Sequence, residues 1–248
     1  KAKFELIEYL PKDGVGFLNI DDELQVNYKL KNNIKIVWYG LSDKADVYAT
    51  DIKYSNKGMS FNVHFKGDEK SYEFTTKLLG EANVYNILAG IAVSKELGLN
   101  IEELQKGVLQ IKTIEHRLEM KKYGNITYID DAYNSNPVGS KMALDVLKLM
   151  PGKKIIITPG MIEMGDKQYE VNYNFGKFIA DSVDLVILVG TNQTKPIQDG
   201  IKDSKFDDDK LIIVNDVKEA INIAQNYYKG KEVYILLEND LPDLFNEK

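Results

Sequence analysis

The stretch ITYIDDAYNSNP, residues 126–137, decides the fold of the second half of the chain. Residues 126–130 are mostly apolar or β-branched and predict a buried strand. The polar loop that follows ends at Pro137, whose fixed φ suits the first turn of a helix. A buried strand that leads through a short polar loop into a helix is the repeating unit of sheets covered by helices.

The same unit repeats through the rest of the second half. Further strand-like runs occupy residues 154–158, 185–189, 211–214 and 233–237. Helix-like segments lie between the runs at residues 139–149, 169–181, 196–202 and 217–228. Apolar strands that alternate with amphipathic helices predict a mostly parallel sheet covered on both faces, as in a Rossmann-like domain. In such sheets ligands bind at the loops that follow the carboxyl ends of the strands.

The first half of the chain has a different rhythm. Short β-rich runs occupy residues 15–20, 34–39, 47–54, 59–65 and 72–78. Two predicted helices follow, at residues 82–97 and 101–109, with Gly98 as a stop and Asn100 as a cap between them. We therefore expect an α/β protein of two domains, the first (residues 1–112) β-rich with helices and the second (residues 113–248) Rossmann-like.

The composition limits the function classes. The net charge is -6 and the lysines are interleaved with acidic residues, which disfavours nonspecific binding to nucleic acid. There are no cysteines, and two histidines, His64 and His116, are too few for a histidine-built zinc site. No apolar run reaches the roughly eighteen residues of a membrane span. These features predict a cytoplasmic protein, and a start at Lys1 within a predicted helix (residues 2–9) suggests part of a longer one.

The polar loop at residues 130–137 is the densest candidate site. Asp130 and Asp131 stand at a strand end, and Asn134 and Asn136 follow on the same loop. Carboxylates and amides in this place can bind hydroxyls or amines. The same residue types also build ordinary capped turns, so the residues alone leave both interpretations open.

Four motifs, in order along nearly the whole chain, resemble the Mur ligase family. The segment IDDAYNSNP (residues 129–137) is similar to the start of the family's C-terminal domain, above all in members that add D-alanyl-D-alanine to UDP-N-acetylmuramoyl-tripeptide. The segment EHRLE (115–119) resembles the family's arginine-bearing linker, and GEANVYN (80–86) resembles a helix start with two asparagines. The segments KFELI (3–7) and FLNIDD (17–22) resemble the family's lysine helix and the strand end after it.

The resemblance implies an activity and a domain plan. Residues 1–112 would be the C-terminal part of the central ATP-binding domain, and residues 113–248 the C-terminal domain. In this family ATP phosphorylates the carboxylate of the growing peptide, and an incoming amine displaces the phosphate. The implied substrates are a UDP-N-acetylmuramoyl-peptide and D-alanyl-D-alanine or a similar amine, with ATP and Mg²⁺. The implied setting is a cytoplasmic monomer that makes peptidoglycan precursor, and so supports the cell wall, cell shape and cell division.

The resemblance also assigns ATP contacts. Asn83 and Asn86 would contact the adenine side, where an amide can both donate and accept. Arg117 would approach the phosphates with its planar fork of donors. Asp131, or its neighbour Asp130, would accept hydrogen bonds from the ribose hydroxyls. From the residues alone, Asn83 could equally be the N-cap of its helix and Arg117 a surface cation.

Three more residues receive roles in the same way. Asn134 and Asn136 would orient the nucleotide or the amine substrate. Lys3 resembles a family lysine that becomes carbamylated and helps hold magnesium, although a lysine on an exposed helix is commonplace. No residue is assigned as a certain metal ligand.

One family element is missing and three positions depart from the pattern. No G-x-x-x-x-G-K-[ST] phosphate loop occurs in the sequence, so we expect the 248-residue chain alone neither to hydrolyse ATP nor to ligate. Ala82 and the Asn172-Tyr173 pair stand where histidines are usual. The final strand leads into Glu238-Asn239-Asp240 instead of a Lys-Gly-Ser loop, and this acidic end would repel the carboxylate of a dipeptide. Either the amine differs or its carboxylate binds elsewhere.

Two other function classes remain in view. A catalytically silent Mur-like interaction protein would keep the fold and account for these departures. A receiver-like signalling domain also pairs aspartates at a strand end to bind magnesium. It expects a lysine after its final strand, where Glu238 to Asp240 stand, and it leaves the β-rich first half unexplained.

Overall fold

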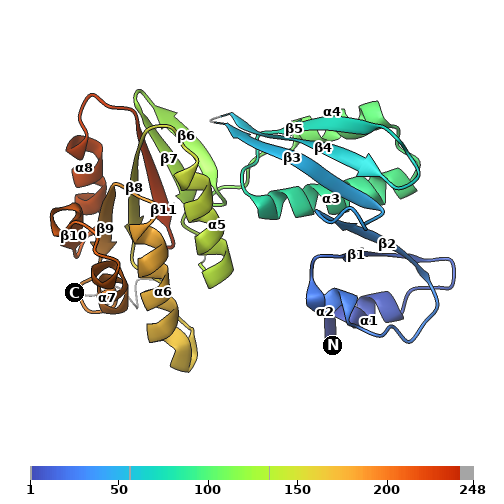
Figure 1. Cartoon of the computed structure of the whole chain (residues 1–248), viewed down its shortest axis with the longest axis horizontal. Helices are drawn as coiled ribbons and strands as arrows, with labels where there is room; N and C mark the ends of the chain where they lie inside the picture. Colours follow the sequence, from blue (N-terminus) through green and yellow to red (C-terminus); the bar gives the residue numbers. More distant parts are fainter. Residues whose placement is uncertain (1, 56, 134, 241–248) are drawn as a thin grey trace. The chain divides into compact units, whose positions relative to one another are not determined.

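The computed structural model describes residues 2–55, 57–133 and 135–240, in two compact units, Lys1–Lys112 and Thr113–Lys248 (Figure 1). The first unit contains a five-stranded sheet and begins with helix α1 (Ala2–Glu8). In sheet order its strands are β1 (Val15–Asn19), β2 (Lys35–Gly40), β3 (Val47–Ser55), β4 (Gly58–Phe65) and β5 (Ser71–Thr76). The first three strands are parallel, and β4 and β5 are antiparallel to their neighbours.

Two long helices complete the first unit, which also contains the short helix α2 (Glu23–Val26) after β1. Helix α3 (Glu81–Glu96) packs on β1, β2 and β3, and α4 (Ile101–Gln110) packs on β5. Their buried side chains join Phe61, Val63 and Phe74 of the sheet in one hydrophobic core. Asn100 caps α4 in a reciprocal capping box with Glu103, as its place after Gly98 predicted.

The second unit has a six-stranded sheet in the order β10-β9-β8-β11-β7-β6. Its strands are β6 (Glu119–Tyr123), β7 (Ile126–Asp131), β8 (Lys153–Thr158), β9 (Leu185–Val189), β10 (Leu211–Val214) and β11 (Val233–Glu238). The last five are parallel to one another, and β6 is antiparallel to β7 at one edge. The predicted α/β class with a mostly parallel second sheet is confirmed, but β6 was not predicted.

Helices cover both faces of this sheet. They are α5 (Pro137–Lys148), α6 (Gln168–Ala180), α7 (Lys195–Asp203) and α8 (Val217–Tyr227). Ala220 and Ala224 of α8 pack on Ile155, Ile187 and Ile235 on one face. Helix α5 packs on β11 and on α6, which in turn packs on α7.

The pairing of β7 with β11 positions the polar loop. Leu237 lies beside Asp130, and Glu238 lies beside Asp131. Because successive side chains of a strand point to opposite faces, Asp130 and Asp131 belong to different faces of the sheet. The carboxyl end of β7 therefore presents one carboxylate to each face.

Candidate functional site

Asp130 is buried and its charge is compensated. It is 6% exposed, and His116 Nδ1 lies 3.0 Å from both of its oxygens. Lys121 Nζ, on β6, donates to Oδ2 at 3.0 Å and also pairs with Glu119. Burial opposes ionisation, but these two partners outweigh it and hold the pKa of Asp130 below its usual value. The first aspartate of the motif is thus held inside a local charge network.

Asp131 has a different environment. Its Oδ1 accepts a hydrogen bond from the backbone N–H of Leu118 at 3.1 Å. Burial raises its pKa to about 6, against the lowering effects of that N–H and of the Arg117 charge. No side-chain cation is within ion-pair distance of Asp131 in the part of the chain that the structure describes. Asp131 is the less compensated carboxylate of the pair.

A tight backbone turn before β6 makes both contacts possible. His116 and Leu118 have φ values of +60° and +50°, a left-handed conformation that costs about 1 kcal/mol for residues other than glycine. The turn directs the His116 ring to Asp130 and the Leu118 N–H to Asp131. Between them, the Arg117 guanidinium lies over the Tyr133 ring, 4.4 Å from its centroid.

Hydrogen bonds join the start of α5 to the residues just before it. Asn136 caps the helix, because its Oδ1 accepts the N–H of Gly139 at 3.0 Å. Ser135 and Ser140, both buried, have their hydroxyl oxygens 2.5 Å apart. Asn134 lies outside the described residues. The predicted role of Asn136 in binding a ligand therefore depends on its amide nitrogen, since its oxygen serves the helix.

The end of β11 is joined to the loop after β8. Asn239 donates from Nδ2 to the carbonyl oxygen of Gly160 at 2.6 Å and from its backbone N–H to that of Asp131 at 3.3 Å. Gly160 has a φ of +85°, and a Cβ there would meet Asn172 Oδ1 at 2.9 Å. Asn172 is buried and binds both the N–H and the carbonyl of Met161, each at 2.8 Å. Asn172, one of the pair that the resemblance places at a usual histidine, thus fixes this loop.

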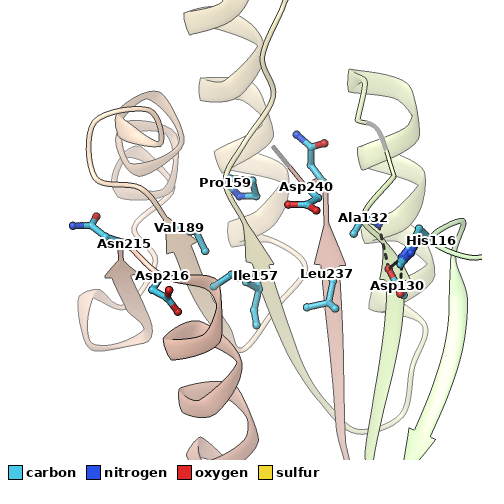
Figure 2. Close-up of a pocket in the computed structure, with 12 residues that line it drawn as sticks. His116, Asp130, Ala132, Ile157, Pro159, Val189, Asn215, Asp216, Leu237 and Asp240 are labelled. Atoms are coloured by element: carbon cyan, nitrogen blue, oxygen red, sulfur yellow. Dashed lines mark hydrogen bonds and ion pairs between the residues drawn. The ribbon is translucent and has the colours of Figure 1, made fainter. Parts of the chain in front are cut away.

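A cavity of about 400 Å³ opens at the carboxyl ends of these strands (Figure 2). Its polar lining comes from His116, Asp130, Asn215, Asp216, Asn239 and Asp240. Asp216 also caps α8 through the N–H groups of Lys218 and Glu219. Asn215 and Asp216 were not among the predicted site residues, although their place directly after β10 was a signal that could have found them.

In the first unit, Asn83 and Asn86 lie next to each other on α3. Asn86 Nδ2 is 3.4 Å from Asn83 Oδ1, and Asn83 donates to the carbonyl oxygen of Leu79 at 2.7 Å. The N-cap of α3 is Gly80, so the alternative that Asn83 caps the helix is wrong. Lys3 is exposed on α1.

Tyr85 of α3 and Asp21 after β1 form a contact that the sequence did not reveal. The Tyr85 hydroxyl donates to Asp21 Oδ2 at 3.2 Å, and the Leu41 N–H donates to the same oxygen at 2.6 Å. Burial, followed by the charge of Asp21, raises the pKa of Tyr85. The strand end of the FLNIDD motif is thereby tied to the helix that carries both asparagines.

Residues 2–55, 57–133 and 135–240 contain no group of three or more histidine and carboxylate side chains suited to hold a metal ion. Within the same residues, no helix has the length and apolar character that crossing a membrane requires.

Comparisons with known proteins agree with this architecture. Residues 1–94 match the model of the Mur ligase middle domain, and residues 116–237 match that of the Mur ligase, glutamate ligase domain. The chain is 30% identical over 237 residues to the UDP-N-acetylmuramoyl-tripeptide--D-alanyl-D-alanine ligase of Bacillus subtilis, which covers 93% of this chain and 50% of that protein. It is 34% identical over 168 residues to the UDP-N-acetylmuramate--L-alanine ligase of Neisseria meningitidis serogroup A, or 63% of this chain and 35% of that one.

The solved structures give the same result. A crystal structure of MurF from Acinetobacter baumannii superposes with a TM-score of 0.77 and 25% identity, over 93% of this chain and 50% of that one. The chain thus spans about half the length of such relatives. Both halves of the chain match domains of one family, with the fold of its solved members, and the chain belongs to the Mur ligase family.

Proposed function

We propose that the chain is part of an ATP-dependent amide ligase of peptidoglycan precursor synthesis. Such an enzyme would join D-alanyl-D-alanine, or a similar amine, to a UDP-N-acetylmuramoyl-peptide through an acyl phosphate. Similarity to the Bacillus subtilis D-alanyl-D-alanine ligase along 93% of the chain supports this reaction class.

The observation that carries the proposal is the contrast between Asp130 and Asp131. Asp130 is engaged by His116 and Lys121, whereas Asp131 has one oxygen on the Leu118 N–H and no ion pair among the described residues. A carboxylate at a strand end can accept hydrogen bonds from two neighbouring ribose hydroxyls. We therefore assign ribose binding to Asp131 and a supporting role to Asp130.

The remaining nucleotide contacts follow from the chemistry of the side chains. Arg117, held over Tyr133, has a fork of N–H donors that suits phosphate oxygens. Asn83 and Asn86 offer amide donors and acceptors to the adenine edge. ATP would supply the phosphoryl group that turns an unreactive carboxylate into an electrophile. Mg²⁺ would neutralise phosphate charge, and Lys3 is proposed as the carbamylated lysine of its site.

The amine substrate is constrained by the charge at the end of β11. Asp240, just after β11, lines the cavity together with Asp130 and Asp216, and the lining residues that the structure describes include no lysine or arginine. This lining suits the ammonium group of an acceptor better than a carboxylate. If D-alanyl-D-alanine is the acceptor, we expect its carboxylate to bind away from Asp240.

The test is an assay of phosphate release from ATP with the product of the whole gene. It uses UDP-N-acetylmuramoyl-tripeptide with a panel of amines: D-alanyl-D-alanine, L-alanine, L-lysine and a dipeptide amide without a carboxylate. We expect release that depends on both the muramoyl peptide and one amine. Release with another amine alone would reassign the acceptor, whereas no release with any amine would favour the catalytically silent alternative.

A second assay addresses the chain itself. We expect the 248-residue chain to release no phosphate from ATP, because the positioning groups of a phosphate loop are absent from its sequence. ATP turnover by the chain that is abolished by Asp131→Ala would contradict this expectation.

A further inference from the structure

Glu238 is a buried carboxyl group for which the proposed reaction has so far given no role. It ends β11, is 1% exposed, and lies in register with Asp131 on the neighbouring strand. Its Oε1 is 3.0 Å from the hydroxyl oxygen of Ser135. Its other oxygen, Oε2, is buried and has no hydrogen-bond partner among the described residues.

Glu238 begins a chain of oxygen atoms that runs to the start of α5. Ser135 Oγ is 2.5 Å from Ser140 Oγ, and Ser140 Oγ is 3.0 Å from the carbonyl oxygen of Asn136. There are three oxygen–oxygen contacts, and each needs one proton between its atoms. The two serine hydroxyls supply two protons.

The third proton must come from Glu238. If Glu238 is protonated, it donates to Ser135, Ser135 donates to Ser140, and Ser140 donates to the Asn136 carbonyl. If Glu238 is ionised, Ser135 donates to it and Ser140 has one proton for two contacts, so either the Ser135–Ser140 contact or the Ser140–Asn136 contact lacks a proton. Only the neutral acid satisfies the whole chain.

The surroundings favour the same form. The facing elements contribute the Ser135 and Ser140 hydroxyls, the Met161 thioether near Ser140, and one charged group, the carboxylate of Asp131. Burial and the charge of Asp131 raise the pKa of Glu238 to about 8, against the lowering effect of the Ser140 and Ser135 hydroxyls. A buried oxygen without a partner is also less costly in a neutral carboxylic acid than in a carboxylate.

We propose that Glu238, in its protonated form, is a positioning residue that holds Ser135 and the start of α5 in the geometry in which Asp131 and Asn136 meet the nucleotide. The assignment rests on the proposed function for its catalytic consequence. When Glu238 loses its proton, one of the contacts made by Ser140 Oγ loses its hydrogen bond, and a second negative charge arises beside Asp131.

The first test compares pH profiles of the whole gene product and its Glu238→Gln variant. A glutamine keeps the shape and always offers a donor, so it imitates the protonated acid at every pH. In the unmodified protein we expect the KM for ATP to rise about tenfold between pH 7 and pH 9, with a smaller change in kcat. The Glu238→Gln variant should match it within about twofold at pH 7 and stay flat to pH 9.

A matched control is Glu232→Gln, at the exposed other end of the same strand region, which should retain the unmodified pH profile. Identical pH profiles for the unmodified protein and Glu238→Gln would overturn the proposal.

A second measurement does not depend on catalysis. The amides of Gly139 and Ser140 donate to Asn136, so their hydrogen exchange reports on the start of α5. At pH 7 we expect Glu238→Ala to accelerate their exchange at least about tenfold relative to Glu238→Gln. Equal exchange in the two variants would overturn the positioning role. Faster exchange in Glu238→Ala would support the positioning role even if the unmodified protein shows no ATP-dependent activity. That inactivity would count against the proposed function instead.

Discussion

The two faces of the second sheet treat adjacent carboxylates in opposite ways at the end of β7. On one face, Asp130 is buried with His116 and Lys121, and its pKa is lowered. On the other, Asp131 faces Glu238 across the β7–β11 pair, and the pKa values of both are raised, to about 6 and about 8. Because successive side chains of a strand point to opposite faces of the sheet, two adjacent aspartates have different environments and different pKa values.

The difference separates stability from function. A compensated carboxylate such as Asp130 stabilises the fold when it is ionised. The pKa of Asp131 is raised on folding, so its protonated form stabilises the folded state. This contribution is fully present below the pKa of the unfolded state and is lost as the pH rises through about 6. A carboxylate whose ionised form is destabilised by the fold is a candidate for ligand binding.

Removing the charge of Asp131 should have the largest effect on binding. We expect Asp131→Asn to weaken nucleotide binding by about 10- to 100-fold, because a hydrogen bond to a charged acceptor is worth about 1.5–3 kcal/mol. The same variant should unfold at a slightly higher temperature than the unmodified protein at pH 8. Calorimetric titration of the gene product with ADP measures the first effect, and Asp145→Asn, on the exposed side of α5, is the control. Unchanged affinity in Asp131→Asn would transfer ribose binding to another residue.

Removing Asp130 should instead affect the fold. We expect Asp130→Ala to lower the free energy of unfolding by about 2 kcal/mol, because Lys121 and His116 lose a charged partner. Since the pKa of Asp130 is lowered on folding, this contribution is present above the unfolded-state pKa and is lost as the pH falls below it. Urea unfolding at pH 7 measures the loss of stability, and the same experiment at pH 3 measures how that loss depends on pH. Asp199→Asn, which breaks an exposed pair with Lys195, should cost less than about 0.5 kcal/mol.

The pH dependence of nucleotide binding should separate the effect of Asp131 from that of Glu238. Protonated Asp131 accepts hydrogen bonds poorly, so affinity should fall by up to about tenfold per pH unit below pH 6. With the loss that Glu238 imposes above pH 8, the profile should be bell-shaped. The acid limb should vanish in Asp131→Asn and persist in Glu238→Gln. An acid limb that survives in Asp131→Asn would show that another group titrates there.

Most of the second unit could be predicted from the sequence. Most side chains of β8, β9 and β11 are buried, and the apolar runs of β7 to β11 and the helices between them were predicted to within a few residues of the observed bounds. The loop from Asp130 to Pro137 could be located for the same reason, because it follows a buried strand. Whether it binds a ligand could not be decided from residues that also build turns.

What escaped prediction depends on polar residues and on unusual backbone. The edge strand β6, with the sequence EMKKY, is too polar to resemble the buried strands, so the partner of Asp130 on it, Lys121, was missed. The contact of His116 with Asp130 requires positive φ values at His116 and Leu118, which no periodicity encodes. Glu238 was assigned to an acidic end, but the register of β11 with β7 buries it.

The smallest predicted effect concerns Arg117, which lies on the Asp131 side of this contrast. A lysine keeps the charge but loses the planar group that stacks on Tyr133 and donates in parallel to two oxygens. Stacking of this kind at an exposed site is worth about 0.5–1 kcal/mol, so we expect Arg117→Lys to weaken nucleotide binding about three- to fivefold. Tyr133→Phe keeps the ring and should bind normally, whereas Tyr133→Leu should reproduce the loss. If Arg117→Lys binds normally while Arg117→Ala does not, charge alone matters and the ring serves only to cover the linker.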